Sequence, residues 1–497
     1  MYIKHEKLRD LTLGALAAEH DNFLEEYFFE SRMFRRVALG HTRVLIGNRG
    51  SGKSAIFRML AKKERQQGTL VEEIMPSDYM FDLLKNSRLF DSNTEWARLG
   101  AYTASWKYVI LITAMRLLHS RFKKLNTHKD DLNAIHAFLR DHLEHHPVTP
   151  LDLLVRFMRK FADIKKVTFE GIQFGDSGDS LEKLYKLEPL LNVIPAIQRL
   201  SQHTKVLILF DELDQGWDAS NDARQFIAGL FRAAIQINQQ FSGIRVLITI
   251  REEIYQNIPE LYEDAQKIRD IIEYVRWTPD ELKGMITQRI KHALELIFNK
   301  EVMISDPDKL WEVIFNQNLA KNGLSSYHYI IDRTLYRPRE LIFFVNECFK
   351  VHNLEQRIGD TTILQVEKNY SKNRLEDIAA EYRFQYRGLK DVFELFRLSP
   401  CRWTRHDLDD LWLEVVEGIK PCPEAALWLN ENCRPDRLIE ILWKVGFLRA
   451  FAKTSAEPEP SDDRYFVGYH QEPTLNIATI NYFDIHPMFR SHLGIAL

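Results

Sequence analysis

Short apolar runs alternate with helical stretches between residues 42 and 277. The runs at 205–210 (KVLILF) and 244–250 (IRVLITI) contain no polar alternation, which is typical of parallel strands buried on both faces. Further strands are predicted at 42–46, 69–75 and 271–277. Because helices separate these strands along the chain, the pattern predicts an α/β fold built on a parallel sheet.

Apolar residues at three- and four-residue spacing predict the helices that surround this sheet. Residues 1–40 are predicted to be helical, and a long helical insertion runs from 96 to about 159 and resumes at 181–200. A cluster of Gly, Asp and Ser at 169–180 predicts a turn between the two parts of the insertion. The insertion, at about 96–200, is longer than a compact core of this kind requires.

The chain from Pro279 to about Tyr382 follows a helical pattern throughout, which predicts a helical lid. Thr278 or Asp280 is expected to cap its first helix, and Asp306 precedes a proline that opens the next.

The last part of the chain combines helices and strands in a winged-helix-like order. Helices are predicted at 390–398, 406–416 and 436–445, and strands at 447–450, 465–469 and 480–485. Gly446 fits a helix C-terminus, and the Pro-, Ser- and acid-rich stretch after 451 predicts a loop. The predicted domains are a core at 1–277 that holds the parallel sheet, the N-terminal helices and the insertion, the lid at 278–385 and the winged-helix-like domain at 386–497.

Composition describes a folded protein of several domains without a global affinity for nucleic acid. At 497 residues and 58.6 kDa the chain exceeds one core, and about 150 residues per domain predicts three. Lys plus Arg number 67 against 70 Asp plus Glu, a formal charge of −3, so no overall basic field drives it onto nucleic acid. Three basic pairs either mark solvated helix faces or form a local patch for nucleic acid or a partner. They are Lys123-Lys124, Arg159-Lys160 and Lys165-Lys166.

The cysteines and the N-terminal sequence favour a cytoplasmic protein. The four cysteines form no CxxC pair and have no histidines at zinc-finger spacing, so neither a disulfide framework nor a zinc site is predicted. The three histidines in HLEHHP at 142–147 are interpreted as a solvated loop, because a proline breaks the helix there and no acidic partners are spaced for a metal. No apolar signal or membrane-spanning segment is present in the sequence. We therefore expect reduced thiols and no membrane partner.

The segment GNRGSGKS at 47–54 carries the strongest chemical signal, because it fits GxxxxGK[ST] at every fixed position. A predicted strand precedes it and a predicted helix follows, so its backbone N–H groups would surround phosphates at the positive end of a helix. Lys53 would contact the β- and γ-phosphates, and the Ser54 hydroxyl would bind Mg²⁺. The expected nucleotide-binding residues are Gly47, Asn48, Arg49, Gly50, Ser51, Gly52, Lys53, Ser54 and Ala55.

Two adjacent carboxylates, Asp211 and Glu212, follow the strand KVLILF. Alternation along a strand would direct them to opposite sides, so that Asp211 holds Mg²⁺ and Glu212 accepts a proton from the attacking water. Asp214 lies just beyond, where it either reinforces the metal side or caps the next helix.

Polar residues also end the next strand and open a lid helix. Thr249 and Arg251 lie where a parallel sheet binds its ligands, so both are placed to sense the γ-phosphate or the attacking water. The alternative for Arg251 is a pair with Glu252, Glu253 or a helix end. In YRPRE at 336–340, Arg337 or Arg339 either projects towards a phosphate or forms a surface pair with Glu340.

These motifs together resemble a known family. The set GNRGSGKS, FDELDQGW, ITIREE, YRPREL and FDIHPMFRSHLGI is similar to that of additional-strand P-loop ATPases on the AAA+/STAND side. The resemblance is strongest to KAP-like and related bacterial ATPases of anti-phage defence. It implies ATP and Mg²⁺ as cofactors, an ATP-bound switch that forms a homo-oligomer, Arg337 or Arg339 as a second sensor, and an arginine acting in trans, either Arg269 or Arg276.

Two functions follow from this resemblance. In the first, the chain is a regulatory ATPase that controls a separately encoded effector, since it carries no nuclease, protease or deaminase signature. In the second, it is an origin-recognition-like ATPase whose winged helix binds DNA. The acidic residues of the wing loop and the slightly acidic chain argue against phosphate contacts and favour the first function.

Overall fold

The structure is a computed structural model that describes residues 11–75, 95–142, 188–261, 269–319, 324–352, 357–431, 434–452 and 465–495. These residues form two compact units. The sheet unit comprises the described parts of Glu30–Asn48 and Lys53–Val275, and the helical unit comprises those of 1–29, Arg49–Gly52 and Arg276–Leu497. Four residues of the glycine-rich segment are thus grouped with the helical unit.

The sheet unit is built on a five-stranded parallel sheet in the order β2-β3-β4-β1-β5. Its strands are β1 (Val44–Ile46), β2 (Leu70–Ile74), β3 (Val206–Phe210), β4 (Ile244–Ile250) and β5 (Ile272–Tyr274). Each strand lies within a predicted run, so the predicted α/β class with a parallel sheet is confirmed. Every residue of β3 and all but Arg245 of β4 are buried, as expected for runs without polar alternation.

The carboxyl ends of β1, β3 and β4 meet at one edge of this sheet. The last residues of β1 and β4 pair with each other, and the last residue of β3 pairs two positions before the end of β4. Gly47, Asp211 and Arg251 follow the three strands and therefore emerge at the same edge, where ligands of parallel sheets bind.

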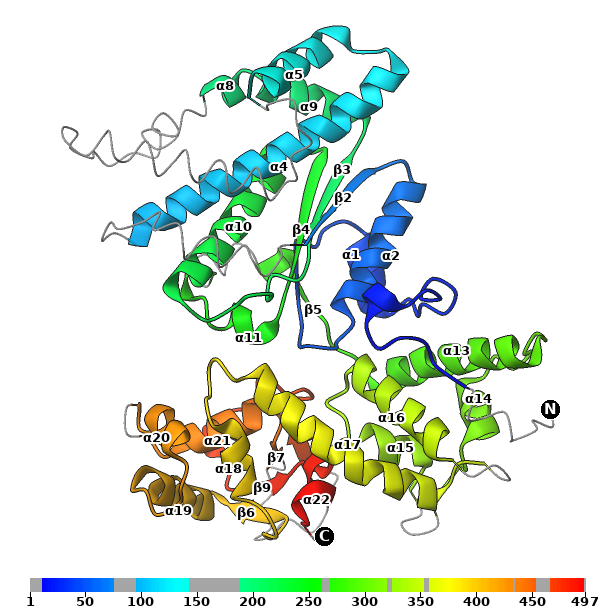
Figure 1. Ribbon diagram of the computed structural model, residues 1–497, viewed down its shortest axis with the longest axis vertical. Helices are drawn as coiled ribbons and strands as arrows, with labels where there is room; N and C mark the ends of the chain where they lie inside the picture. Colours follow the sequence, from blue (N-terminus) through cyan, green and yellow to red (C-terminus); the bar gives the residue numbers. More distant parts are fainter. Residues whose placement is uncertain are drawn as a thin grey trace. The chain divides into compact units, whose positions relative to one another are not determined.

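Helices cover both faces of the sheet, with α1 and α2 on one side and α4 and α10 on the other (Figure 1). They are α1 (Arg32–Ala38), α2 (Lys53–Gln66), α4 (Glu95–Leu125) and α10 (Asn221–Gln240). Helices α4 and α10 cross closely at Gly229, where an added Cβ would lie 2.6 Å from the Cβ of Tyr102. The Trp106 indole N–H donates to the Phe226 carbonyl at 3.1 Å. The insertion helix α4 is therefore packed closely against α10 within the sheet unit.

The described residues of the first part of the predicted insertion, 95–142, form two helices. Helix α4 ends at Leu125, and α5 (Lys129–His142) follows after Asn126 and His128, whose φ angles are 52° and 54°. These left-handed conformations cannot continue a right-handed helix. Helices α8 (Glu188–Leu191) and α9 (Ile194–His203) confirm the helical pattern near residue 200. The predicted turn at 169–180, most of HLEHHP and two of the basic pairs lie outside the described residues.

The helical region from Pro279 to Glu381 is confirmed. Its helices are α13 (Pro279–Phe298), α14 (Pro307–Ile314), α15 (Ser326–Ile331), α16 (Pro338–Val351) and α17 (Asp360–Glu381). Thr278 is the cap of α13, because its hydroxyl accepts from Glu281 N–H while the Glu281 carboxylate accepts from Thr278 N–H. Asp306 caps α14 as predicted. No helix among the described residues is long and apolar enough to cross a membrane.

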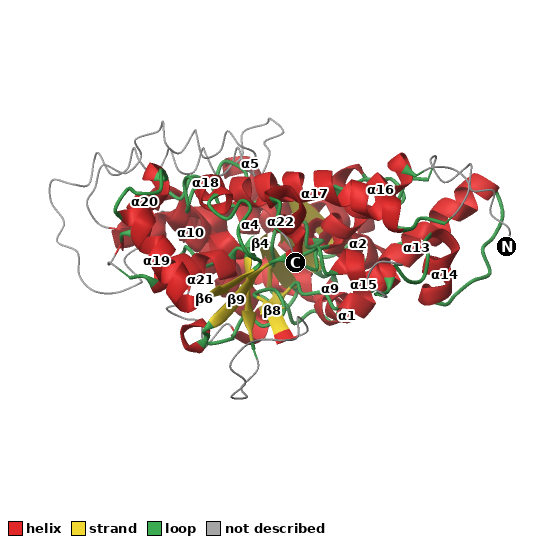
Figure 2. Ribbon diagram, turned by 90° about the horizontal axis from the view of Figure 1, so that it is seen from below, coloured by secondary structure: helices red, strands yellow, loops and turns green. Residues whose placement is uncertain are grey.

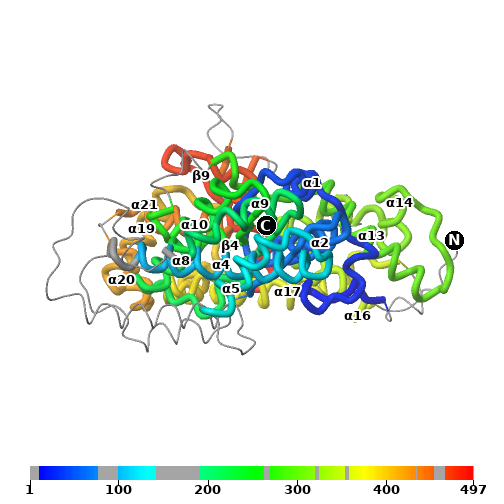
Figure 3. Tube along the Cα trace, turned by 90° about the horizontal axis from the view of Figure 1, so that it is seen from above, coloured from blue at the N-terminus to red at the C-terminus, as the bar shows by residue number. Residues whose placement is uncertain are grey.

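Residues 11–29, which we call the N-terminal strap, run beside α13 (Figures 1 and 3). The predicted helix is wrong here, because the described helical residues of the strap are a single 3₁₀ turn, Ala18–His20. The Leu13 carbonyl accepts from the Arg289 guanidinium of α13, and Arg289 also pairs with Asp21 at 3.1 Å. Bonds to α13 thus replace the intrahelical bonds that a helical strap would make.

The C-terminal part of the helical unit holds a four-stranded antiparallel sheet in the order β6-β9-β7-β8, surrounded by helices (Figure 2). The strands are β6 (Arg402–Thr404), β7 (Leu448–Phe451), β8 (Phe466–Gly468) and β9 (Tyr482–Ile485). The helices are α18 (Leu389–Glu394), α19 (Arg405–Val416), α20 (Pro423–Leu429), α21 (Asp436–Lys444) and α22 (Pro487–Leu493). The predicted helices and strands are present, whereas β6, α20 and α22 are additional. A three-residue strand such as β6 is too short to show a period.

Two histidines beside this sheet are kept neutral by their surroundings. Burial, together with nearby arginines, lowers the pKa of His470 to about 3. Burial also lowers the pKa of His486 far below its ordinary range. The Nδ1 atom of His486 accepts from Met488 N–H at 3.2 Å, which only an unprotonated nitrogen can do. The folded helical unit therefore resists protonation of both rings.

We expect the helical unit to lose stability as the pH falls below about 6.5, the ordinary histidine pKa. Below this pH the two histidines take up protons in the unfolded chain but not in the folded unit. Their contribution to stability is therefore complete above about pH 6.5 and is lost as the pH falls towards their folded pKa values. At pH 5, His470 alone accounts for up to about 2 kcal/mol. Urea unfolding at pH 7 and pH 5 measures the difference. His470→Phe should reduce it, and His406→Gln, at a side chain that is 86% exposed, should not; an unchanged difference in His470→Phe contradicts this account.

Candidate functional site

The glycine-rich segment links the end of β1 to the start of α2. Gly50 and Gly52 have φ angles of 77° and 95°, which residues with side chains rarely adopt. Helix α2 begins at Lys53, so Ser54 and Ala55 lie in its first turn. The local order of strand, loop and helix is the predicted one, and it places the loop at the positive end of a 14-residue helix.

Lys53 turns back onto the loop that precedes it. Its ammonium group donates to the carbonyls of Gly47 at 2.8 Å and Asn48 at 3.1 Å. Burial lowers the pKa of Lys53, and three nearby carboxylates act in the opposite direction, those of Glu253, Asp211 and Asp214. A cation thus lies among carbonyl and carboxylate groups at the carboxyl edge of the sheet.

Asp211 emerges at this edge directly after β3 and is 2% exposed. Its Oδ1 accepts a hydrogen bond from the Thr249 hydroxyl on β4. Its Oδ2 is buried and has no hydrogen-bond partner among the described residues. A buried carboxylate oxygen without a partner is costly, and it suits a cation or a water bound to a cation. The structure thus brings together Asp211 and Thr249, and near them Lys53.

Glu212 lies beyond the end of β3, in a turn of its own. Its φ angle is 58°, in the left-handed region, and its carboxylate accepts from the side-chain amide of Gln215. Strand alternation therefore does not apply to Glu212, contrary to expectation, because β3 ends at Phe210. Backbone strain at a non-glycine residue persists where surrounding contacts enforce it. Here the hydrogen bond from Gln215, three residues further along the chain, holds the Glu212 carboxylate in place.

Arg251 pairs with carboxylates of the sheet unit. It forms an ion pair with Asp214 and lies 3.7 Å from the Glu253 carboxylate. This arrangement matches the pairing alternative for Arg251, and its role as a sensor stays a prediction. Asp214 does not cap the next helix, because Ser220 does so by accepting from Ala223 N–H at 3.3 Å.

Arg337 precedes α16 and is 4% exposed. Its Nη1 donates to Glu381 at 2.8 Å, and its Nε lies 3.7 Å from Glu340. Burial alone would lower the pKa of Arg337, but these two carboxylates raise it above its ordinary value. The predicted surface pair with Glu340 is therefore a buried one. Arg337 also donates to the Arg49 carbonyl at 3.3 Å.

Arg339 lies in the first turn of α16 and is half-buried. Its backbone N–H donates to the Gly50 carbonyl at 3.3 Å, and its Nε donates to the Leu16 carbonyl of the strap at 3.2 Å. The two arginines of the RPR motif thus differ, since Arg337 is fixed by buried carboxylates and Arg339 lies on the loop.

The two arginines predicted to act in trans also differ. Arg269 is exposed in a 3₁₀ turn, Arg269–Ile271, of the sheet unit. Arg276 belongs to the helical unit, where its guanidinium lies 6.0 Å from the centre of the Tyr469 ring.

Sequence reasoning missed two residues of the candidate site: Gln215, which contacts Glu212, and Trp277, which contacts the glycine-rich segment. Gln215 bonds Glu212, and the sequence offers a signal, since a three-residue separation at a strand end fits a turn. Trp277 donates its indole N–H to the Ser51 carbonyl at 2.8 Å. Nothing in the sequence around Trp277 indicates this contact, because the two residues are far apart in the chain.

The described residues contain no group of three or more His, Cys, Asp or Glu side chains placed to hold a metal ion. A metal at the carboxyl edge would therefore need ligands from elsewhere, such as water or a bound phosphate. Mg²⁺ commonly binds in this way, with one or two protein ligands and several waters. The free Oδ2 of Asp211 and the Ser54 hydroxyl fit that coordination.

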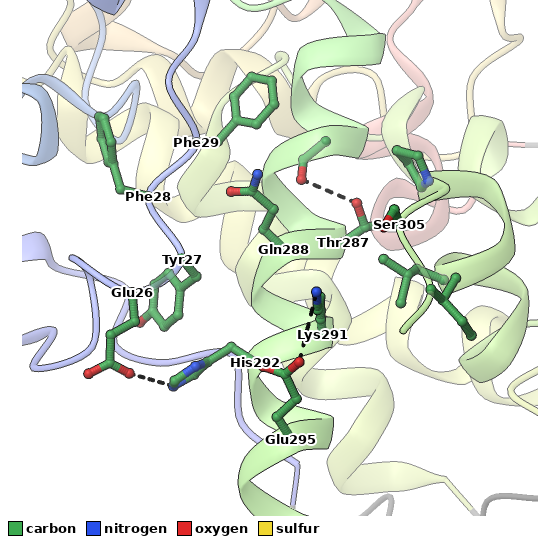
Figure 4. Close-up of a pocket in the computed structure, with 14 residues that line it drawn as sticks. Glu26, Tyr27, Phe28, Phe29, Thr287, Gln288, Lys291, His292, Glu295 and Ser305 are labelled. Carbon is green, nitrogen blue, oxygen red and sulfur yellow. Dashed lines mark hydrogen bonds and ion pairs between the residues drawn. The ribbon is translucent and has the colours of Figure 1, made fainter. Parts of the chain in front are cut away.

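A separate cavity of about 490 Å³ lies in the helical unit between the strap and α13. Figure 4 shows its lining, in which Glu26 pairs with His292 at 3.2 Å and Lys291 faces Glu295 at 3.9 Å. None of the predicted site residues lines this cavity. The aromatic residue Phe29 forms part of its wall.

Comparison with known proteins adds a family for the helical region. Residues 280–379 match the FunZ-associated C-terminal helical domain, a range that covers most of α13 to α17. Over 393 residues, the chain is 27% identical to the putative transposon gamma-delta 80.3 kDa protein of Escherichia coli (strain K12). That alignment covers 77% of this chain and 53% of the transposon protein.

A second similarity is to Allergen Alt a 2 of Alternaria alternata, 26% identical over 152 residues, which is 30% of this chain and 75% of the allergen. The chain spans about half the length of the transposon protein. It is thus distantly related to a transposon-associated protein and carries a FunZ-associated helical region.

Proposed function

We propose that the chain is a Mg²⁺-dependent ATPase whose nucleotide state regulates a partner. One observation carries the proposal: Lys53, from a GxxxxGKS loop, lies near the buried, unsatisfied carboxylate of Asp211 at the carboxyl edge of a parallel sheet. This combination suits a triphosphate and its Mg²⁺. The glycine-rich turn alone would need neither the lysine nor the carboxylate.

The residues of the site divide the work of hydrolysis among them. The loop N–H groups and Lys53 hold the phosphates, and Ser54 together with Asp211 holds the cation. Glu212 accepts the proton of the attacking water, and Thr249 orients Asp211 through its hydroxyl. When bound, Mg²⁺ neutralises charge on the phosphate oxygens.

The strand order supports membership of the additional-strand P-loop class. Strand β4 lies between β1, which leads into the loop, and β3, which leads into the carboxylates. An inserted strand between these two is the feature after which that class is named. The AAA+/STAND side of the class, including KAP-like ATPases, is the subgroup that we propose.

The similarity to the transposon protein supports a regulatory role in a mobile element or in anti-phage defence, because the name of that relative links it to a mobile element. The FunZ-associated match covers the region that we propose as a lid. We propose that ATP drives homo-oligomer assembly, that the assembly controls a separately encoded effector, and that the helical region acts as a lid. Arg339, on the loop, is the better candidate for the second sensor, and the exposed Arg269 is the better candidate to act in trans.

DNA binding by the C-terminal part is the alternative function. The order β6-β9-β7, with α21 before β7, is that of a winged helix and favours it. However, the arginines around α21 are paired with acids: Arg434 with Glu440 at 2.6 Å, and Arg437 with Glu431 at 3.7 Å. Such pairs reduce the charge available to phosphates, so we favour the regulatory ATPase.

Phosphate release and particle mass test the proposal together. The purified chain should release phosphate from ATP with Mg²⁺, lose that activity in EDTA, and increase in mass on binding ATP. GTP provides the control for base choice, since no residue identified here reads adenine. Phosphate release that is equal with and without Mg²⁺, or absent altogether, would refute the ATPase. A filter-binding titration of duplex DNA at two salt concentrations tests the alternative, because phosphate contacts weaken steeply with salt.

A further inference from the structure

Three consecutive carbonyls of the glycine-rich segment are each held by a donor from the helical unit. The Arg49 carbonyl accepts from Arg337 Nη1 at 3.3 Å, and the Gly50 carbonyl accepts from Arg339 N–H at 3.3 Å. The Ser51 carbonyl accepts from the indole N–H of Trp277 at 2.8 Å, the shortest of the three. All six residues belong to the helical unit, and we call these three contacts the carbonyl clamp.

The carbonyl clamp also determines where the loop N–H groups point. In a trans peptide, the C=O of one residue and the N–H of the next lie in one plane and point in opposite directions. Each of the three carbonyls, of Arg49, Gly50 and Ser51, is held by its donor, so the N–H group of the residue that follows it is turned away from that donor. These three N–H groups belong to the loop that would surround the phosphates.

The donors of the clamp are themselves held in place. Arg337 is buried and bonded to Glu381. The Trp277 ring packs on Phe29 of the strap, with ring centres 6.4 Å apart, and its Cζ2 lies 3.8 Å from the position of a Cβ on Gly52. A donor that is fixed before the ligand arrives costs no ordering at the moment of binding.

We propose that Trp277 is a positioning residue of the nucleotide site, acting through the Ser51–Gly52 peptide. Its indole N–H keeps this peptide turned so that the Gly52 N–H is presented to phosphate. Arg337 has the same role for the Arg49–Gly50 peptide and contacts the loop backbone instead of the phosphate. The inference rests on the proposed ATPase function, and it makes phosphate affinity depend on the region that opens α13 and α16.

Trp277→Phe tests the inference, because phenylalanine keeps an aromatic ring and removes the indole N–H. The dissociation constant of Mg·ATP should rise about tenfold, the effect of one lost hydrogen bond. Inorganic pyrophosphate should lose affinity by a similar factor, since it engages the loop alone. The turnover number at saturating ATP should stay within about twofold, and the thermal midpoint without nucleotide should change little. A purely structural role would lower the thermal midpoint and leave no selective loss for phosphate ligands.

Trp443→Phe is the matched control. Trp443 is buried, whereas Trp277 is half-buried. The indole nitrogen of Trp443 has no hydrogen-bond partner among the described residues, so its replacement should leave both affinities unchanged. Trp277→Met, which also lacks a donor, gives a second measurement should the phenylalanine variant fold poorly. If the wild-type chain binds Mg·ATP and both Trp277 variants bind it equally well, the inference is overturned and the ATPase stands. If the wild-type chain binds neither ATP nor pyrophosphate, the ATPase and the inference fall together.

Discussion

Lys53→Ala is expected to weaken the binding of Mg·ATP at least about a hundredfold. Charge-assisted hydrogen bonds to phosphate contribute about 3 kcal/mol in such sites, which is about two powers of ten in affinity. Lys53 is the lysine of the GxxxxGKS loop, and its ammonium group already donates to the carbonyls of Gly47 and Asn48. Equilibrium binding of a fluorescent ATP analogue measures the loss.

The substitution should not unfold the sheet unit, because the two carbonyls that Lys53 leaves can bond water at a half-buried position. Lys63→Ala, in the same helix α2, is the control and should bind ATP as the wild-type chain does. Tight ATP binding by a folded Lys53→Ala protein would remove the glycine-rich loop as the nucleotide site.

Sequence reasoning succeeded where a local pattern determines the structure. The strands β3 and β4 were predicted because strands buried on both faces are apolar throughout. The loop at 47–54 was predicted because it fits GxxxxGK[ST] between a strand and a helix, and in the structure Gly50 and Gly52 adopt positive φ angles that other residues rarely adopt. The Thr278 cap was one of two alternatives, and the Glu281 side chain three residues on distinguishes it.

The strap was mispredicted because distant contacts determine its conformation. Phe23, Tyr27 and their neighbours have helical spacing, but Tyr27 bonds Asp21 and lies under the Arg289 guanidinium of α13. Arg289 also takes the Leu13 carbonyl. A partner more than 250 positions away does not affect the local spacing of apolar residues from which the helix was predicted. Tertiary contacts therefore override the helical preference of the strap.

The candidate site shows the same division between local and distant contacts. Lys53 could be chosen from the GxxxxGK[ST] motif, and Asp211 and Thr249 from strand ends, because parallel strands present their carboxyl ends together. Their partners could not. The ion pair between Arg251 and Asp214 and the bond from Trp277 to the loop depend on side-chain directions that only the folded chain defines.

Glu212→Gln is expected to bind ATP as tightly as the wild-type chain and to hydrolyse it at least about a hundredfold more slowly. Loss of a general base costs about this much, and glutamine keeps the size of the side chain while removing its basicity. The Gln215 amide that now donates to Glu212 can still donate to the new amide oxygen, so the turn should persist. Single-turnover phosphate release, with ATP affinity measured separately, distinguishes slow chemistry from weak binding.

Asp218→Asn is the matched control, because it removes a carboxylate from the loop that follows this turn. Asp218 Oδ1 accepts from Ser220 N–H at 3.1 Å, a bond that the asparagine oxygen can also accept, so turnover should stay within about twofold. Wild-type turnover in Glu212→Gln would show that the water is activated elsewhere, and Asp214 would become the next candidate. That reassignment has a physical cost, since Asp214 already forms an ion pair with Arg251, and this contact would have to be given up before the carboxylate could bond the attacking water.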